Sequence, residues 1–115
     1  MANRFLEQVM EKLTPHGPIR ARAMFGGYGI YYGDLMFACI VEDKLYFRIG
    51  ESNKMDYEKY GSKSFTYDGG KRPVIMPYMT LPEEIFENPL RLKKWIEKAN
   101  EASFLSKQKK KRLLP

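Results

Sequence analysis

The stretch that decides the fold is MFGGYGIYYGDLMFACIVEDKLYFRI, residues 24–49. Three apolar or aromatic runs in it are separated by the dipeptides Gly33-Asp34 and Glu42-Asp43, which are signals for two-residue turns. Residues 35–41 are apolar at every position, which is typical of a strand buried on both faces. We therefore expect an antiparallel meander of three strands with residues 35–41 at its centre.

Further strands should extend this meander on both sides. Residues 19–25 alternate apolar residues with Arg20, Arg22 and Met24, and a period of two residues indicates a strand with the arginines on one face. Residues 64–68 and 72–79 flank Gly69-Gly70 and predict another strand pair. The segment over residues 19–25 should pair at one edge of the meander.

Helices are predicted at both ends of the chain. Residues 3–14 place their apolar side chains on one helical stripe, and a long helix should open at Pro89. Between them we expect a short surface helix within residues 51–61, capped by Ser52 or Asn53, and a single turn in which Thr80 reaches toward Glu83. The predicted fold class is α+β: an antiparallel β-sheet meander covered by the N-terminal and C-terminal helices.

The composition fits one folded domain. With 115 residues, of which 43% are hydrophobic, the chain suffices for a single core. Its one cysteine, Cys39, excludes an intrachain disulfide, and no uncharged apolar run is long enough to span a bilayer. We expect a cytoplasmic protein without a membrane partner, organised as a domain over residues 1–104 and a basic, disordered tail over residues 105–115.

The tail carries most of the formal charge of +6. Five of the 20 lysines and arginines lie in it, which leaves 15 basic against 14 acidic residues in the body. Such a run attracts polyanions by releasing their counterions, so weak nucleic-acid binding is predicted there. The candidate polyanion-binding residues are Lys107, Lys109, Lys110, Lys111 and Arg112.

No constellation in the sequence favours catalysis or a cofactor. Tyr32 stands where a dinucleotide-binding loop that starts at Gly27 needs its third glycine, and no helix follows. His16 and Cys39 are the only imidazole and thiol, and Cys39 sits inside an apolar strand. We therefore predict a protein that is not an enzyme and has no cofactor, metal or catalytic residue. Gly26 and Gly27 should serve backbone geometry, through positive φ or close approach, rather than hold a phosphate.

Arginines and tyrosines of the predicted sheet form the best candidate site. Aromatic and guanidinium groups often anchor protein interfaces, and they also stack on exposed bases. The simpler alternative is cross-strand packing of tyrosines covered by arginine stems. The protein-interaction candidates are Arg20, Arg22, Tyr28 and Tyr31.

The same residues suggest a family. Met24, Phe25, Gly26, Gly27, Gly29 and Tyr31 form the pattern MFGG.G.Y, and MPYMTLPEEI and a terminal helix with Trp95 follow it. This order resembles the N-terminal domain of the TfoX/Sxy family of bacterial competence regulators. The resemblance implies an α+β domain without known catalytic residues, in a single-domain form. It also implies a regulatory or adaptor role, in transcription and through an unidentified protein partner; the alternative is direct nucleic-acid binding through the tail and the Arg/Tyr face.

Overall fold

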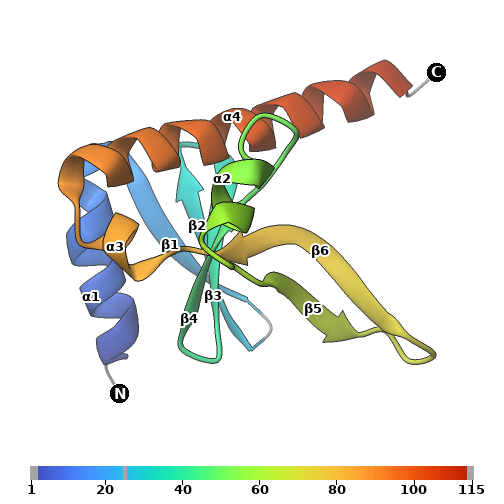
Figure 1. The fold of residues 1–115 in the computed structure, drawn as a ribbon, viewed down its shortest axis with the longest axis horizontal. Helices are drawn as coiled ribbons and strands as arrows, with labels where there is room; N and C mark the ends of the chain where they lie inside the picture. Colours follow the sequence, from blue (N-terminus) through green and yellow to red (C-terminus); the bar gives the residue numbers. More distant parts are fainter. Residues whose placement is uncertain (1–2, 25, 114–115) are drawn as a thin grey trace.

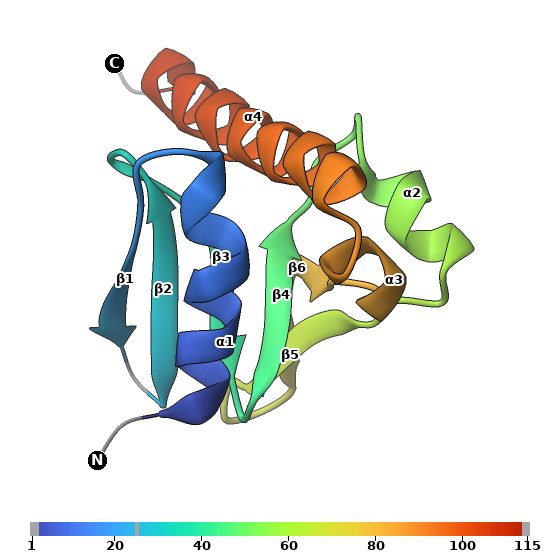
Figure 2. The ribbon, with the colours of Figure 1, turned by 90° about the vertical axis from the view of Figure 1, so that its left-hand side faces the viewer.

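The strands form one antiparallel sheet in the order β1-β2-β3-β4-β6-β5, as Figures 1 and 2 show. The computed structural model describes residues 3–24 and 26–113, with side chains through Lys110. The strands are β1 (Ile19–Met24), β2 (Gly27–Tyr32), β3 (Leu35–Val41), β4 (Lys44–Arg48), β5 (Ser64–Asp68) and β6 (Pro73–Thr80). The predicted meander is β2, β3 and β4, joined by the two predicted turns, and β1 pairs at its edge.

The helices lie on one face and one end of the sheet. They are α1 (Arg4–Leu13), α2 (Lys54–Lys59), α3 (Glu83–Phe86) and α4 (Pro89–Leu113). In Figure 2, α1 lies across β2 and β3, while α4 crosses the end of the sheet and projects beyond it in Figure 1. The α+β fold class predicted from the sequence is therefore confirmed. Along the described residues we find no helix whose length and apolar content would let it cross a bilayer.

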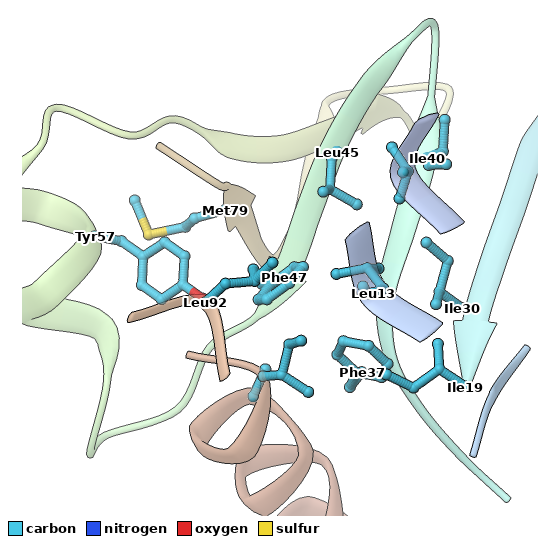
Figure 3. Close-up of a cluster of buried hydrophobic side chains, with 14 residues drawn as sticks. Leu13, Ile19, Ile30, Phe37, Ile40, Leu45, Phe47, Tyr57, Met79 and Leu92 are labelled. Atoms are coloured by element: carbon cyan, nitrogen blue, oxygen red, sulfur yellow. The ribbon is translucent and has the colours of Figure 1, made fainter. Parts of the chain in front are cut away.

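The main core lies between the helices and the sheet (Figure 3). Leu13 of α1 and Leu92 of α4 pack there against Ile30, Phe37 and other residues of the strands. The register between β2 and β3 shifts next to Ile30, so that β3 has one extra residue, Phe37, in this stretch. This irregularity lets two successive residues of β3, Phe37 and Ala38, both join the main core.

A second, smaller cluster lies on the other side of the sheet. Cys39, Tyr46 and Tyr78 are buried there, and Met36, Val41, Phe65 and Met76 pack against them. Residues of β3 thus contribute to a core on each face, which explains why residues 35–41 are apolar throughout. The expectation that this segment is a central strand is confirmed.

The C-terminal segment differs from the expectation. We predicted a disordered tail from residue 105, whereas α4 continues as a helix to Leu113. The prediction rested on charge and on the absence of an apolar face. However, lysine, glutamine and leucine are good helix formers, and extending an existing helix needs no new nucleus. The domain boundary at residue 104 stays a prediction.

Two predicted caps also differ. Thr80 belongs to β6, and its hydroxyl accepts a hydrogen bond from the Lys63 amide at 3.1 Å rather than capping α3. Asn53 occupies the N-cap position of α2, but its side chain bonds backward along the chain. Its Oδ1 accepts from the Gly50 amide at 2.7 Å, and its Nδ2 donates to the Arg48 carbonyl at 3.1 Å. Asn53 therefore holds the connection from β4 to α2.

Candidate protein-interaction surface

Three of the four predicted interaction residues lie together on one face of the sheet. Arg20 pairs with Tyr31 across β1 and β2, and Arg22 pairs with Gly29. The Arg20 guanidinium lies 5.3 Å from the centre of the Tyr31 ring, within the range of a cation–π interaction. We call the side of the sheet that faces away from α1 the open face. Its residues include Arg20, Arg22, Tyr31, Met36, Cys39, Tyr46, Arg48, Phe65 and Tyr78.

Tyr28 does not belong to this group. It pairs with Ala23, and its side chain packs against the main core on the helix side of the sheet. Because side chains alternate along a strand, Tyr28 and Tyr31 point to opposite faces of β2. The structure therefore separates Tyr28 from the other three candidates, because its partly buried ring packs against the main core.

The open face contains a second arginine–tyrosine pair that the list of candidates lacked. The guanidinium of Arg48 lies 5.5 Å from the ring centre of Tyr78, and these residues pair across β4 and β6. Because Tyr46 and Arg48 alternate with the apolar residues Leu45, Phe47 and Ile49, the sequence could have placed Arg48 on this face. Tyr78 gave no such signal, because the strand that carries it is not the next strand along the chain.

An apolar cavity of about 110 Å³ lies on the open face, with Cys39 and Val41 among the residues that line it. Met24 of β1 and Phe65 of β5 both line it, although these strands are at opposite edges of the sheet. The sheet is therefore curled about this face. Met36, Met76 and Tyr78 complete much of the wall, and flexible methionine side chains can adapt to different apolar partners.

The aromatic rings at the centre of this face are poorly placed for stacking on bases. Tyr46 and Tyr78 are only 9% and 7% exposed, and burial raises the pKa of both phenols. Tyr31 is half-buried, with Arg20 over its ring. Single-stranded nucleic acid is bound on rings whose faces are open, so these tyrosine rings are poorly suited to stack on bases.

The charges at the β1 edge of the open face have no ion-pair partner among the described side chains. Arg20 and Arg22 are exposed, and neither is in an ion pair with a described carboxylate. The ion pairs within residues 3–24 and 26–110 lie among the helices, as in Lys12 with Glu87 and Arg91 with Glu84. Two exposed guanidinium groups on one strand therefore remain available to an acidic partner.

The polyanion-binding candidates lie on the projecting end of α4. Lys107, Lys109 and Lys110 are exposed. The side chains of Lys111 and Arg112 lie outside the described residues, as does Phe25 of the family pattern. Lys107 and Lys110 are three positions apart and lie on one side of α4, whereas Lys109 is rotated by about 160° from Lys107, so the three described lysines spread over about half of the helix circumference.

The described residues offer little for catalysis. Burial raises the pKa of the Cys39 thiol from 9.0 to about 12, which keeps the thiol protonated and weakly nucleophilic at neutral pH. His16 lies in a short 3₁₀ turn, Thr14–His16. Within the part of the chain that the structure describes, no three His, Cys, Asp or Glu side chains gather as a metal ion would require.

Comparisons with known proteins bear on the same residues. Residues 11–103 match the family model described as the TfoX N-terminal domain. Protein Sxy of Escherichia coli K12 is 30% identical over 82 residues, which are 71% of this chain and 39% of that protein. The DNA transformation protein TfoX1 of Aliivibrio fischeri is 28% identical over 95 residues, which are 83% of this chain and 46% of that protein. The match therefore spans less than half the length of either relative.

Proposed function

The chain belongs to the TfoX N-terminal domain family, and from this premise we propose that it is a regulatory domain that binds another protein through the open face of its sheet. It acts by contact rather than by catalysis. By extension from its relatives, the setting is bacterial competence or the transcription that controls it, in the cytoplasm. Fold alone does not carry such a role, so the argument depends on the surface itself.

One observation carries the proposal. Arg20 and Arg22, which form no ion pair with a described carboxylate, lie beside an adaptable apolar cavity on a face that the helices leave uncovered. Protein interfaces commonly combine a buried apolar centre with arginine and aromatic residues around it. The open face has both parts, with Tyr31 next to the arginines and Met24 at the wall of the cavity.

Affinity capture from the cell that naturally produces the protein tests this function. The full chain is used as bait, with and without nuclease treatment of the lysate. The proposal expects a partner that survives nuclease and is lost when Arg20 and Arg22 are both replaced by glutamate. A partner that disappears with nuclease, or that is retained by the folded double variant, contradicts the proposal.

A second candidate function is weak binding of polyanions by the end of α4. It is favoured by the exposed Lys107, Lys109 and Lys110 on a helix that projects from the body (Figure 1). Such binding depends on charge and is strongly weakened by salt. It would add sequence-independent contact with nucleic acid to the protein contact described above.

A further inference from the structure

β1 is an edge strand whose second side is not paired by any described strand. It pairs with β2 alone, over its full length from Ile19 to Met24. An edge strand presents backbone amides and carbonyls to which another extended chain can pair. The other edge, β5, has a register irregularity between Ser64 and Thr66, and irregular pairing makes an edge less suitable for a further strand.

The register shows which backbone groups of β1 point outward. The Gly33 amide donates to the Pro18 carbonyl at 3.0 Å, just before β1 begins. Hydrogen-bonded pairs alternate along antiparallel strands, so the groups of Arg20 and Arg22 point toward β2. The amides and carbonyls of Ala21 and Ala23 consequently point away from the sheet.

The side chains of β1 define what can pair with it. Arg20 and Arg22 stand two residues apart on the open face, and β1 contains no carboxylate. Ala21 and Ala23 on the other face are small and leave the backbone accessible. A strand laid beside β1 would therefore meet two positive charges on one face and only the small side chains of Ala21 and Ala23 on the other.

We propose that the β1 edge accepts an extended acidic segment of a partner protein as a seventh, antiparallel strand. Its carboxylates, at positions i and i+2, lie beside Arg20 and Arg22 on the open face, and its intervening residues bond to the backbone of Ala21 and Ala23. This proposal rests on the proposed function and specifies how the partner binds. Main-chain bonds supply affinity in this mode, while the side chains supply selectivity.

A second copy of the chain fits this edge poorly. Two β1 strands placed side by side would bring Arg20 and Arg22 of both copies together on one face, and like charges in cross-strand positions destabilise a sheet. An acidic segment instead satisfies both guanidinium groups. Charge complementarity therefore favours an acidic segment over a second copy of the chain at the β1 edge.

The probe is an acetylated decapeptide that alternates Glu and Thr, added to the ¹⁵N-labelled full chain. We expect the amide signals of Ala21 and Ala23 to shift and their hydrogen exchange to slow on binding. A decapeptide that alternates Lys and Thr should not bind. Absence of binding by the Glu-Thr peptide, or shifts confined to residues away from β1, would overturn the proposal.

N-methylation of the peptide separates strand addition from simple charge attraction. In the antiparallel arrangement the Thr amides point to β1 and the Glu amides point to solvent. Methylation of the Thr amides should weaken binding by about tenfold or more, because it removes donors and places bulk at the edge. Methylation of the Glu amides should leave most of the affinity. Any other order of the two affinities contradicts the proposal.

Variants of β1 give the matched test on the protein. Ala21→Pro removes an outward amide at an edge position where proline is tolerated, and it should weaken binding by about tenfold, whereas Ala21→Ser keeps the amide and the affinity. If Ala21→Pro does not fold, the methylated peptides still decide. Loss of cellular capture by Arg20→Glu with Arg22→Glu, but not by Ala21→Pro, supports the proposed function and refutes strand addition. Concentration-dependent dimers of the parent that Ala21→Pro abolishes would assign the edge to a second copy and refute the acidic occupant.

Discussion

The carbonyl oxygen of Ile40 occupies the space in which a β-carbon on Gly27 would lie. The two residues are on neighbouring strands, near the end where β2 begins, and the close approach is between backbone and backbone. No side-chain movement could relieve such a clash. Next to it, Gly26 has a φ of +69°, in the left-handed region that favours glycine. The two glycines thus fulfil the two geometric roles that the sequence suggested.

Substitution of either glycine should destabilise the fold. We expect Gly27→Val and Gly26→Val each to lower the free energy of unfolding by about 1 to 3 kcal/mol, as judged by denaturant midpoints. Gly26→Asn is the matched control, since asparagine tolerates positive φ and should cost less. If both valine variants unfold at the midpoint of the parent, the geometric account of these glycines is wrong.

Gly29 provides an internal comparison for Gly27. A β-carbon there would meet the sulfur atoms of Met24 and Met36, which are the ends of flexible side chains. We therefore expect Gly29→Ala to cost less stability than Gly27→Ala in the same denaturation experiment. The opposite order would show that backbone approach is not what limits position 27.

The Cys39 thiol should be nearly inert in the folded protein. Its pKa of about 12 leaves roughly three orders of magnitude less thiolate near pH 8 than a thiol with a pKa of 9.0. Reaction with a thiol reagent at pH 8 should therefore be slow in buffer and fast in denaturant. Because there is one cysteine, the signal has one source. Rapid modification without denaturant would place Cys39 outside the core.

The raised pKa of the Cys39 thiol also predicts how the stability of the protein changes at alkaline pH. Below pH 9 the thiol is protonated in both the folded and unfolded states, so Cys39 adds no pH dependence. Between about pH 9 and pH 12 only the unfolded state loses the proton, which favours unfolding. The free energy of unfolding should fall with rising pH in this window, and Cys39→Ala should reduce the slope. If the free energy of unfolding falls with pH equally steeply in the Cys39→Ala variant, the raised pKa of Cys39 is contradicted.

Asn53 should be important for the connection between β4 and α2. The residue is 2% exposed, and its amide bonds to the backbone of Gly50 and Arg48. Asn53→Ala removes both bonds and leaves the part-buried Gly50 amide and Arg48 carbonyl without this partner, at a cost of about 1 to 3 kcal/mol. Ser52→Ala, an exposed neighbour, is the control and should change thermal unfolding little. Equal melting temperatures for both variants would refute this role.

The end of α4 should contribute to polyanion binding but little to stability. Truncation after Ser106 removes all five positive charges of the segment and no residue of either core cluster. Binding to duplex DNA should weaken, and its dependence on salt should decrease. A large drop in melting temperature, or unchanged binding that is insensitive to salt, would assign the segment another role.

Local signals made much of this fold predictable from the sequence. In the two hairpins formed by β2, β3 and β4, the turn residues directly follow the apolar and aromatic residues that identify each strand. The face of β2 to which Tyr28 points could not be read from the sequence. β2 has tyrosines at positions 28, 31 and 32, so polarity does not reveal which face is buried. Packing against the main core, to which both α1 and the distant α4 contribute, decides that question.

Features that depend on distant pairing could not be read from the sequence. The contact between Arg48 and Tyr78 requires β6 to lie beside β4, with β5 outside it. The cavity requires the curl that brings Met24 and Phe65 to one wall. Residues 105–113 were misjudged because composition describes a tail in isolation, whereas α4 supplies the helix that it extends.

The most direct test of the central claim is quantitative capture of a protein partner from nuclease-treated lysate. The parent is compared with a triple variant, Arg20→Glu, Arg22→Glu and Tyr31→Ala, and with Lys93→Glu plus Lys94→Glu on the exposed side of α4. All three must show the same folded spectrum. The account predicts that the parent and the α4 control retain the partner and the triple variant loses it. Retention by the folded triple variant would contradict the claim that the open face is the binding surface.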